Sequence, residues 1–414
     1  MPRKKWPAGK TLSKAMLALN IIGRFQALSA FLYHPTHTHR AHTSNIPLKL
    51  KNKLLPAMSP PATAIHSQSD ASSPSTVSTQ KANDHNTTTR LKYMTSMEKI
   101  CKDHSIFLLD MWGVMHDGTN PYDGVIDTIS QLKALGKKMI ILSNSSKRRD
   151  TAVKMLIKLG FDPDDFDEII TSGEISHQML SGDPTLACRT WPTLTTIRDR
   201  GPFHKKVFCL GSGSHDEQYV TSAGWTLSPI SEASLILARG TFTVNDGTTI
   251  VKKTEDEEKY FRVLDESLRV AAARRVPMLV SNPDKVRPDV GLPPMPGALG
   301  DLYQSLLSGE GSEELVKRIG KPFGEVYELA LNGSDPADAV MVGDALETDV
   351  TGGGAAGCRT VWVVKDGIHG DAVEEMGGGY EQGVERVLED FNEGKGFLNG
   401  DGVRPSFVVP HFRW

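Results

Sequence analysis

The feature that most constrains the fold is a series of short apolar runs, each of which ends on polar residues. "SIFLLD" ends on Asp110, and "KMIILSNSS" carries Ser143 and Asn144 at its end. Between them, "VIDTISQLKALG" shows helical spacing of apolar residues and stops at a glycine. Strands that alternate with helices predict a parallel sheet with right-handed crossovers, and the chemistry of such sheets sits beyond the carboxyl ends of the strands.

The same order of residues returns towards the end of the chain. In "AVMVGDALETDVTGGGAAG" (339–357) an apolar run is followed by Gly343, Asp344 and Asp349, and "TVWVVKDG" is a further strand. A glycine at the strand end lets the chain turn, so the two carboxylates can face one site. Clustered carboxylates with no His or Cys nearby favour a hard, octahedral ion such as Mg²⁺, although each aspartate alone could instead serve a turn or cap a helix.

Four short segments, taken together, resemble the motifs of a known family. "DMWGV", "LSNSS", "GKP" and "VGDALETD" follow one another as in the haloacid dehalogenase-like superfamily. The chain resembles the subgroup with a large α/β cap between the second and third motifs, which includes p-nitrophenyl-phosphatase-like and nucleotide-phosphatase-like enzymes. The resemblance implies an α/β fold with a Rossmann-like, doubly wound parallel-sheet core and an inserted α/β cap. It divides the chain into a leader (1–95), a first core segment (96–176), the cap (177–305) and a second core segment (306–414).

The resemblance also implies catalytic roles. Asp110 is the expected nucleophile, which attacks a phosphoryl group and forms an aspartyl-phosphate that water hydrolyses. Ser143 and the backbone N–H groups around Asn144 would bind phosphoryl oxygens, and Lys321 would neutralise the charge of phosphate and nucleophile. Ser143 could instead cap a helix. Lys321 could instead be a solvated surface residue, in which case the alternative lysines are Lys285 and Lys317.

A magnesium ion is the cofactor that the resemblance implies. Its expected ligands are the carboxylates of Asp110 and Asp344 and the backbone carbonyl of Trp112, with Asp349 either a further ligand or placed directly behind them.

Trp112 departs from the usual motif. Phosphatases of this superfamily carry a second aspartate two residues after the nucleophile, which protonates the leaving oxygen and then activates water. This chain has a tryptophan there, in a "DxWGVxHDG" variant of the motif. Three interpretations stay open: a preference for good leaving groups, another acid such as His116 or Asp117, or a reaction other than phosphate hydrolysis. The last includes a dehalogenase-like hydrolase and a sensor that binds phosphorylated ligands without turnover.

The cap is expected to set substrate specificity, because its loops would close over a generic phosphate site. Asn282 and Asp284 in "SNPD" are the predicted substrate-binding residues, with Arg239 a weaker candidate. Asn-Pro-Asp could equally form a turn. The segment 181–204 fits no regular period and predicts a loop insertion, and the glycines of "TGGGAAG" predict tight packing and turning after a helix, not a phosphate loop.

The first 92 residues differ in charge from the remainder. They hold 13 Lys and Arg against 2 Asp and Glu, whereas residues 93–414 hold 34 against 48. A basic, Ser-rich, acid-poor leader that cannot bury a core is typical of a transit peptide, which predicts a mitochondrion or plastid. The alternative is a non-functional extension before Met94 or Met97, and then a cytoplasmic protein.

The expected function is therefore Mg²⁺-dependent hydrolysis of a small phosphorylated metabolite. The acidic folded region argues against a nucleic-acid partner, and no apolar run reaches the roughly 18 residues of a membrane helix. A homodimer formed through the cap is a further expectation. Four scattered cysteines without a CxxC pair predict reduced thiols in an intracellular compartment, with no disulfide frame and no Cys-based zinc site.

Overall fold

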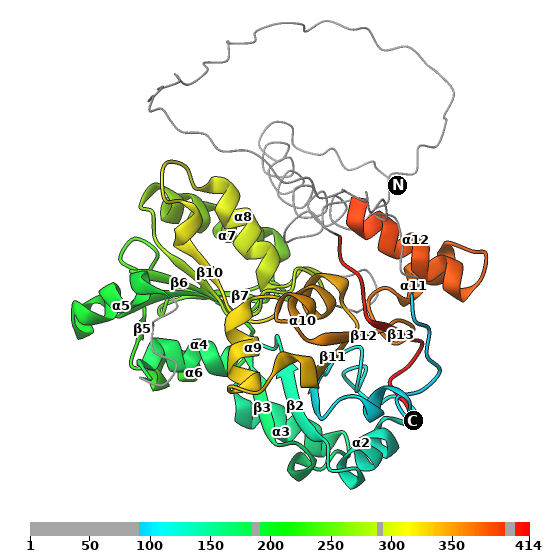
Figure 1. Ribbon diagram of the computed structural model, residues 1–414. Helices are drawn as coiled ribbons and strands as arrows, with labels where there is room; N and C mark the ends of the chain where they lie inside the picture. Colours follow the sequence, from blue (N-terminus) through cyan, green and yellow to red (C-terminus); the bar gives the residue numbers. More distant parts are fainter. Residues whose placement is uncertain (1–90, 184–190, 288–292, 394–401) are drawn as a thin grey trace, which may run out of the picture. The chain divides into compact units, whose positions relative to one another are not determined.

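Two β-sheets organise the region of the chain that the computed structural model describes, which is residues 91–183, 191–287, 293–393 and 402–414 (Figure 1). The expected leader lies almost wholly outside these described residues. Within them, none of the helices combines the length and apolar character needed to cross a bilayer. The described cysteines Cys101, Cys209 and Cys358 are buried and form no disulfide with one another.

The first sheet is the parallel core that the sequence predicts. Its six strands lie in the order β13-β12-β11-β1-β2-β3, and every pairing is parallel. The strands are β1 (Ile106–Leu109), β2 (Lys138–Ser143), β3 (Glu168–Thr171), β11 (Ala339–Gly343), β12 (Arg359–Val363) and β13 (Phe407–Val409). The strands with chemical motifs, β11, β1 and β2, are neighbours in this sheet.

Burial on both faces explains why these strands read as continuous apolar runs. Side chains of a strand point alternately to opposite faces. Ile106 and Leu108 therefore belong to one apolar cluster, and Phe107 and Leu109 belong to another. The cluster around Ile106 continues into the second sheet, where it includes Val207.

The second sheet is mixed and is inserted in the chain between β3 and β11. Its main order is β10-β9-β6-β4-β7-β8, and β5 pairs with β4. The pairings of β7 with β4 and β8 are antiparallel and the others are parallel. The strands are β4 (Lys206–Gly211), β5 (Thr226–Leu227), β6 (Leu235–Ala238), β7 (Thr243–Asn245), β8 (Ile250–Lys252), β9 (Met278–Val280) and β10 (Val316–Arg318). This sheet is the predicted α/β cap, so the predicted fold class is confirmed.

Helices accompany both sheets. Those associated with the core sheet are α2 (Val125–Ala134), α3 (Arg149–Lys158), α4 (Ser172–Ser181), α9 (Gly324–Leu331), α10 (Thr351–Ala355), α11 (Gly370–Glu375) and α12 (Tyr380–Glu393). Those of the cap are α5 (Pro192–Asp199), α6 (Asp216–Ser222), α7 (Glu257–Ala273) and α8 (Pro296–Leu306). Short 3₁₀ turns are η1 (Ile100–Lys102), η2 (Pro163–Asp165), η4 (Pro202–His204), η5 (Glu313–Leu315) and η6 (Pro336–Asp338).

The prediction of an irregular insertion over 181–204 is wrong for residues 192–199, which form α5. Pro192 starts this helix at a position where the missing N–H costs nothing, and Leu194 and Ile197 bury one face. Two apolar residues are too few to show a period in the sequence, so packing against the cap decides this helix. Residues 184–190 of the same segment lie outside the described residues.

Gly352, Gly353 and Gly354 of "TGGGAAG" pack tightly, as predicted, but they lie within the helix α10, whereas Gly357 follows the helix and turns the chain with a φ of +86°. A Cβ atom at Gly352 would lie 2.5 Å from the Tyr327 hydroxyl oxygen, and one at Gly353 would lie 2.7 Å from Cβ of Met341. These glycines therefore let α10 approach α9 and β11 closely.

Candidate active site

The candidate site forms where β1, β2 and β11 end. β1 pairs in parallel with β11, with Leu109 opposite Val342, and the Asp110 N–H extends this ladder by donating to the Val342 carbonyl at 2.9 Å. Ser143 ends β2, on the other side of β1. The parallel register thus brings the ends of the predicted motifs to one edge of the sheet.

Two glycines let the backbone approach the carboxylates. Gly113 has a φ of +81°, a conformation that glycine adopts without strain, and a Cβ there would lie 2.2 Å from Oδ2 of Asp344. A Cβ at Gly343 would lie 2.1 Å from Cβ of Asp349. Any other residue at these positions would push the two aspartates away from the site.

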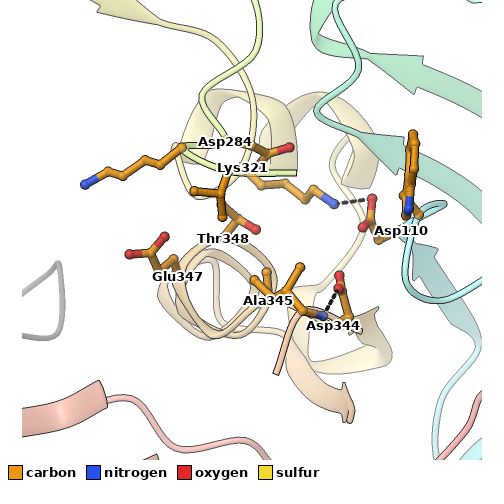
Figure 2. A pocket seen from close by; sticks show the side chains of 11 residues that line it. Asp110, Asp284, Lys321, Asp344, Ala345, Glu347 and Thr348 are labelled. Atoms are coloured by element: carbon orange, nitrogen blue, oxygen red, sulfur yellow. Dashed lines mark hydrogen bonds and ion pairs between the residues drawn. The ribbon is translucent and has the colours of Figure 1, made fainter. Parts of the chain in front are cut away.

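Three carboxylates and one ammonium group meet at this edge. Oxygen atoms of Asp110, Asp344 and Asp349 all lie within 4.8 Å of one another. The Lys321 Nζ atom lies 2.7 Å from Oδ1 of Asp110 and 2.7 Å from Oδ1 of Asp349. Figure 2 shows the Lys321 ammonium pointing at Asp110. If all four groups are ionised, two negative charges remain without a partner among them.

The excess charge perturbs the site's ionisation. Burial, together with the charges of Asp110 and Asp349, raises the pKa of Asp344 well above its usual value. Burial raises the pKa of Asp349 to about 6, although Lys321 opposes that shift. For Lys321 itself burial disfavours the charge, but Asp110 and Asp349 outweigh burial and the net effect raises the pKa. Three carboxylate oxygen donors, two of them on buried residues, with surplus negative charge fit a hard divalent cation, so this triad could hold a metal ion.

Backbone and aromatic N–H groups hold two of these aspartates in place. The Ile368 N–H donates to Oδ2 of Asp344 at 2.9 Å, and the indole N–H of Trp362 donates to the Asp344 backbone carbonyl at 3.0 Å. Asp349 lies on the π-helical turn η7 (Leu346–Val350), and its Oδ2 accepts from the Ala345 N–H at 3.0 Å. Sequence reasoning assigned no role to Trp362 or to the loop after β12, because nothing in the apolar run marks them.

A neutral histidine supports the same turn. Nε2 of His369 accepts from the Leu346 N–H at 3.4 Å, and burial lowers the pKa of His369 to about 4. The imidazole is therefore uncharged at neutral pH and adds no positive charge beside the carboxylates. Sequence reasoning also missed this residue.

Asn144 joins three segments through its side chain, whereas the sequence pointed only to backbone groups near it. Its Nδ2 donates to Oδ1 of Asp284 at 2.7 Å and to the Lys321 carbonyl at 3.0 Å, and its Oδ1 accepts from the Lys321 N–H at 2.7 Å. The buried Ser143 lies next to it, and the Ser143 Oγ accepts from the Ser145 N–H at 3.3 Å. Asn144 thus fixes the backbone of Lys321 from both sides.

The predicted cap residues occupy different environments. Asn282 is 2% exposed, and its Oδ1 accepts from the Asp284 N–H at 2.9 Å, which is a turn contact. Arg239 donates to Asp216 at 2.6 Å and to the Ser146 carbonyl at 3.3 Å, so its guanidinium is held inside the protein. Of these residues, Asp284 alone contributes to the wall of the cavity described next.

A cavity of about 60 Å³ opens between the core carboxylates and residues 284–286 of the cap, which we call the cap segment (Figure 2). It is lined by Asp110, Trp112, Asp284, Lys285, Val286, Lys321, Asp344, Ala345, Glu347, Thr348 and Ile368. The alternative lysines are engaged elsewhere: Lys285 forms an ion pair with Asp301 at 3.1 Å, and Lys317 forms one with Glu325. Lys321 is therefore the lysine that contacts the predicted nucleophile.

Trp112 contributes to this wall, but the two acids proposed on its loop do not. His116 is fully buried, with its ring 5.9 Å from the Trp112 ring, and Nδ1 accepts from the Gly118 N–H. Burial lowers the pKa of His116 to about 4. Asp117 is exposed, and hydrogen bonds from Asn120 and Thr119 lower its pKa. The geometry therefore brings neither residue to the nucleophile.

Comparison with known families agrees with the motif order. Residues 107–226 match the family described as haloacid dehalogenase-like hydrolase, and residues 318–393 match a related family described as HAD-hydrolase-like. The first match begins on β1 and includes Asp110, and the second includes Lys321, Asp344 and Asp349. The chain belongs to the haloacid dehalogenase-like superfamily. Its inserted second sheet places it in the capped, p-nitrophenylphosphatase-like subfamily, a family of phosphoric monoester hydrolases.

Three proteins to which this chain is similar are phosphatases by name. The chain is 24% identical over 273 residues to the D-glycerol 3-phosphate phosphatase of Mycobacterium tuberculosis, which covers 65% of each chain. It is 25% identical over 266 residues to phosphoglycolate phosphatase 2 of Arabidopsis thaliana, covering 62% of this chain and 82% of that enzyme. Among solved structures, the p-nitrophenyl phosphatase from Archaeoglobus fulgidus shares the fold with a TM-score of 0.50 and 22% identity, over 75% of this chain and 97% of that one.

Proposed function

We propose that this protein is a Mg²⁺-dependent phosphatase that hydrolyses the phosphate monoester of a small metabolite through an aspartyl-phosphate on Asp110. The observation that carries the proposal is the contact of one buried ammonium group with two carboxylates, since Lys321 lies 2.7 Å from both Asp110 and Asp349. A carboxylate can attack a phosphate dianion only where positive charge offsets the repulsion between the two anions.

The chain's own residues would share the work as follows. Asp110, at the end of β1, attacks the phosphorus, and Lys321 neutralises charge on both the nucleophile and the incoming phosphate. Ser143 and the N–H groups that follow β2 bind phosphoryl oxygens. Because Asn144 holds the Lys321 backbone at 2.7 and 3.0 Å, the ammonium is in place before substrate arrives, and its reorganisation costs little during the reaction.

The proposed metal ligands are the carboxylates of Asp110, Asp344 and Asp349, together with the backbone carbonyl of Trp112. The raised pKa values of Asp344 and Asp349 support this assignment, because they show that the protein alone does not neutralise these groups. Magnesium bound there would supply the positive charge that the triad lacks and would bind an oxygen of the phosphate.

The size of the cavity supports a small substrate. About 60 Å³ lies between the core carboxylates and the cap residues Asp284, Lys285 and Val286. The similar enzymes act, by their names, on glycerol 3-phosphate and phosphoglycolate. We therefore infer a compact, polar leaving alcohol.

Trp112 supports a second candidate, which is a protein that binds a phosphorylated ligand without turning it over. The indole lines the cavity at the position where the superfamily's phosphatases carry an acid. A missing general acid lowers rates by about 10²–10⁴-fold, but it does not weaken phosphate binding by Lys321 and the metal.

The first test is hydrolysis of p-nitrophenyl phosphate by the full chain, with Mg²⁺ and with EDTA, beside Asp110→Asn and Trp112→Asp. The leaving group is good, so a missing acid matters little. We expect turnover that requires Mg²⁺ and falls by a factor on the order of 10³ or more in Asp110→Asn. Asp117→Asn is the matched control, because Asp117 is an exposed carboxylate on the same loop and lies outside the cavity.

Either result is informative. Retention of the parent's rate by Asp110→Asn would contradict the aspartyl-phosphate mechanism. No turnover by the parent, with activity appearing in Trp112→Asp, would favour the binding protein. If the parent is active, phosphate release from glycerol 3-phosphate and phosphoglycolate would next define the substrate class.

A further inference from the structure

The cavity wall contains two carboxyl groups outside the proposed metal ligands, Asp284 and Glu347. We propose that Asp284 is the general acid and base of this site and replaces the acid that Trp112 cannot provide. The proposal rests on the proposed function, and it assigns a catalytic residue to the cap segment instead of the nucleophile loop.

The position of Asp284 favours it over Glu347. One side chain, Asn144, donates to Asp284 at 2.7 Å and holds both backbone polar groups of Lys321, whose ammonium contacts Asp110. These contacts connect Asp284, through Asn144 and Lys321, to the part of the cavity wall that contains Asp110. Figure 2 shows Glu347 far from Asp110, on the opposite side of the cavity.

The contacts of Asp284 leave one oxygen for proton transfer. Oδ1 accepts from Asn144 Nδ2, so a proton on this carboxyl belongs on Oδ2. The backbone is fixed on both sides of the side chain, because the Asp284 N–H donates to Asn282 at 2.9 Å and its carbonyl accepts from the Gly297 N–H at 2.9 Å. The carboxyl group is thus held in place while it still borders the cavity.

The charge environment suits an acid that works near neutral pH. Burial raises the pKa of Asp284 to about 7, with Asp110 and Asp349 acting in the same direction, and with the Asn144 hydrogen bond and Lys321 opposing them. Lys285, the next residue along the chain, also lies in the cavity wall with Asp344 and Glu347, and its ammonium pairs with Asp301 at 3.1 Å. A catalytic acid is most effective when its pKa lies close to the working pH.

The two steps balance in atoms and electrons. In the first, a carboxylate oxygen of Asp110 forms a bond to phosphorus while the bond from phosphorus to the leaving oxygen breaks, and that oxygen takes the electron pair and the proton of Asp284. In the second, the Asp284 carboxylate removes a proton from water as the water oxygen bonds to phosphorus. The bond from Asp110 to phosphorus then breaks, which releases phosphate and regenerates both aspartates.

The test compares leaving groups in the full-length chain with Mg²⁺. Asp284→Asn keeps an oxygen that can accept from Asn144 but has no acidic proton. The substrates are aryl phosphates of decreasing leaving-group acidity, from p-nitrophenyl to phenyl phosphate, followed by glycerol 3-phosphate. We expect kcat/KM of Asp284→Asn to fall more steeply than that of the parent along this series, approaching a loss of about 10²–10⁴-fold for the poorest leaving group.

A second readout separates chemistry from positioning. With p-nitrophenyl phosphate the first step needs no acid, whereas the second still needs the base. Asp284→Asn should therefore lower kcat and KM together and leave kcat/KM within about tenfold of the parent. A residue that only positions Asn144 or Lys321 would instead lower kcat/KM by the same factor for every leaving group.

Three results would overturn the assignment. They are an equal loss for all leaving groups in Asp284→Asn, no loss for any of them, and a leaving-group-dependent loss in Glu347→Gln that Asp284→Asn lacks. Failure of the proposed function looks different, because the parent itself would then show no Mg²⁺-dependent release of p-nitrophenol.

Discussion

Asp344 of the core and Asp216 of the cap are both buried aspartates that follow a strand end, and they are 3% and 7% exposed. Their surroundings differ. Asp216 accepts from the Ser212 and Gly213 N–H groups at 3.1 Å and pairs with Arg239 at 2.6 Å. Asp344 accepts from one backbone N–H, that of Ile368, and shares its surroundings with two further carboxylates.

This difference indicates a structural role for the carboxylate of Asp216 and a functional role for that of Asp344. In the cap, the protein itself supplies the partners of the buried carboxylate, and Arg239 gains a further contact because its guanidinium lies 4.0 Å from the Tyr219 ring centre. In the core, three carboxylates share one ammonium, and this surplus of negative charge supports the proposed binding of a cation and a phosphate. Buried charges that the fold does not neutralise indicate a candidate ligand site.

The largest expected effect comes from replacing the buried aspartate of the cap, Asp216, by asparagine. Asp216→Asn leaves the buried guanidinium of Arg239 without a counter-ion and should lower the free energy of unfolding by about 3–5 kcal/mol. Thermal and urea unfolding would measure it. If the variant were as stable as the parent, the ion pair of Asp216 and Arg239 would not stabilise the cap, and the proposed difference between the cap and core aspartates would be wrong.

Lys321→Met should lower kcat/KM by about 10²–10³-fold, because it removes the positive charge that faces the developing charge of the transition state. The matched control is Lys317→Met, since Lys317 pairs with Glu325 and lies outside the cavity. Similar losses in the two variants would show that the decrease reflects general damage to the protein.

Mg²⁺ should stabilise the parent by about 2.7 kcal/mol at a concentration a hundred times its Kd, because the proposed site exists only in the folded chain. Asp344→Asn should abolish this shift. Melting temperatures with Mg²⁺ and with EDTA would measure it, independently of any activity. An unchanged Mg²⁺ shift in Asp344→Asn would exclude Asp344 as a ligand.

Without metal, Asp344→Asn should have the opposite sign to Asp216→Asn. Burial, together with the charges of Asp110 and Asp349, raises the pKa of Asp344, so removing this carboxylate should make the metal-free variant more stable than the metal-free parent. A loss of stability at pH 7.5 in EDTA would show that the Ile368 contact outweighs these effects.

The smallest effect concerns the junction of core and cap. Nε2 of His177, on α4, lies 2.9 Å from the Ser222 hydroxyl of α6, and burial lowers the pKa of His177 to about 4. The unfolded state binds the proton more tightly, so stability is lost as pH falls from about 6.5 towards 4. His177→Asn should therefore reduce the loss between pH 7 and 5.5 by about 1 kcal/mol, which melting temperatures would show. The exposed His204 is the control, and an equal slope in His204→Asn and His177→Asn would contradict the assignment.

Much of this protein was determined by its sequence alone. The apolar runs that end on Asp110, Ser143 and Asp344 predicted the parallel sheet, and parallel strands bring their carboxyl ends to one edge whatever packs around them. The order of motifs was enough to identify the superfamily, and it favoured Lys321, whose contact with Asp110 only the structure shows. These features are local or follow from the topology, so they can be read one segment at a time.

Tertiary structure decided which distant groups meet. Asn144 and Asp284 are 140 positions apart, yet their hydrogen bond joins the core edge to the cap segment. The burial of His116 and the exposure of Asp117, which remove both from the cavity, also depend on packing. The ion pair between Arg239 and Asp216 within the cap depends on packing as well. A sequence shows which residues can donate, accept or carry charge, but distance and desolvation select among them, and both are properties of the folded chain.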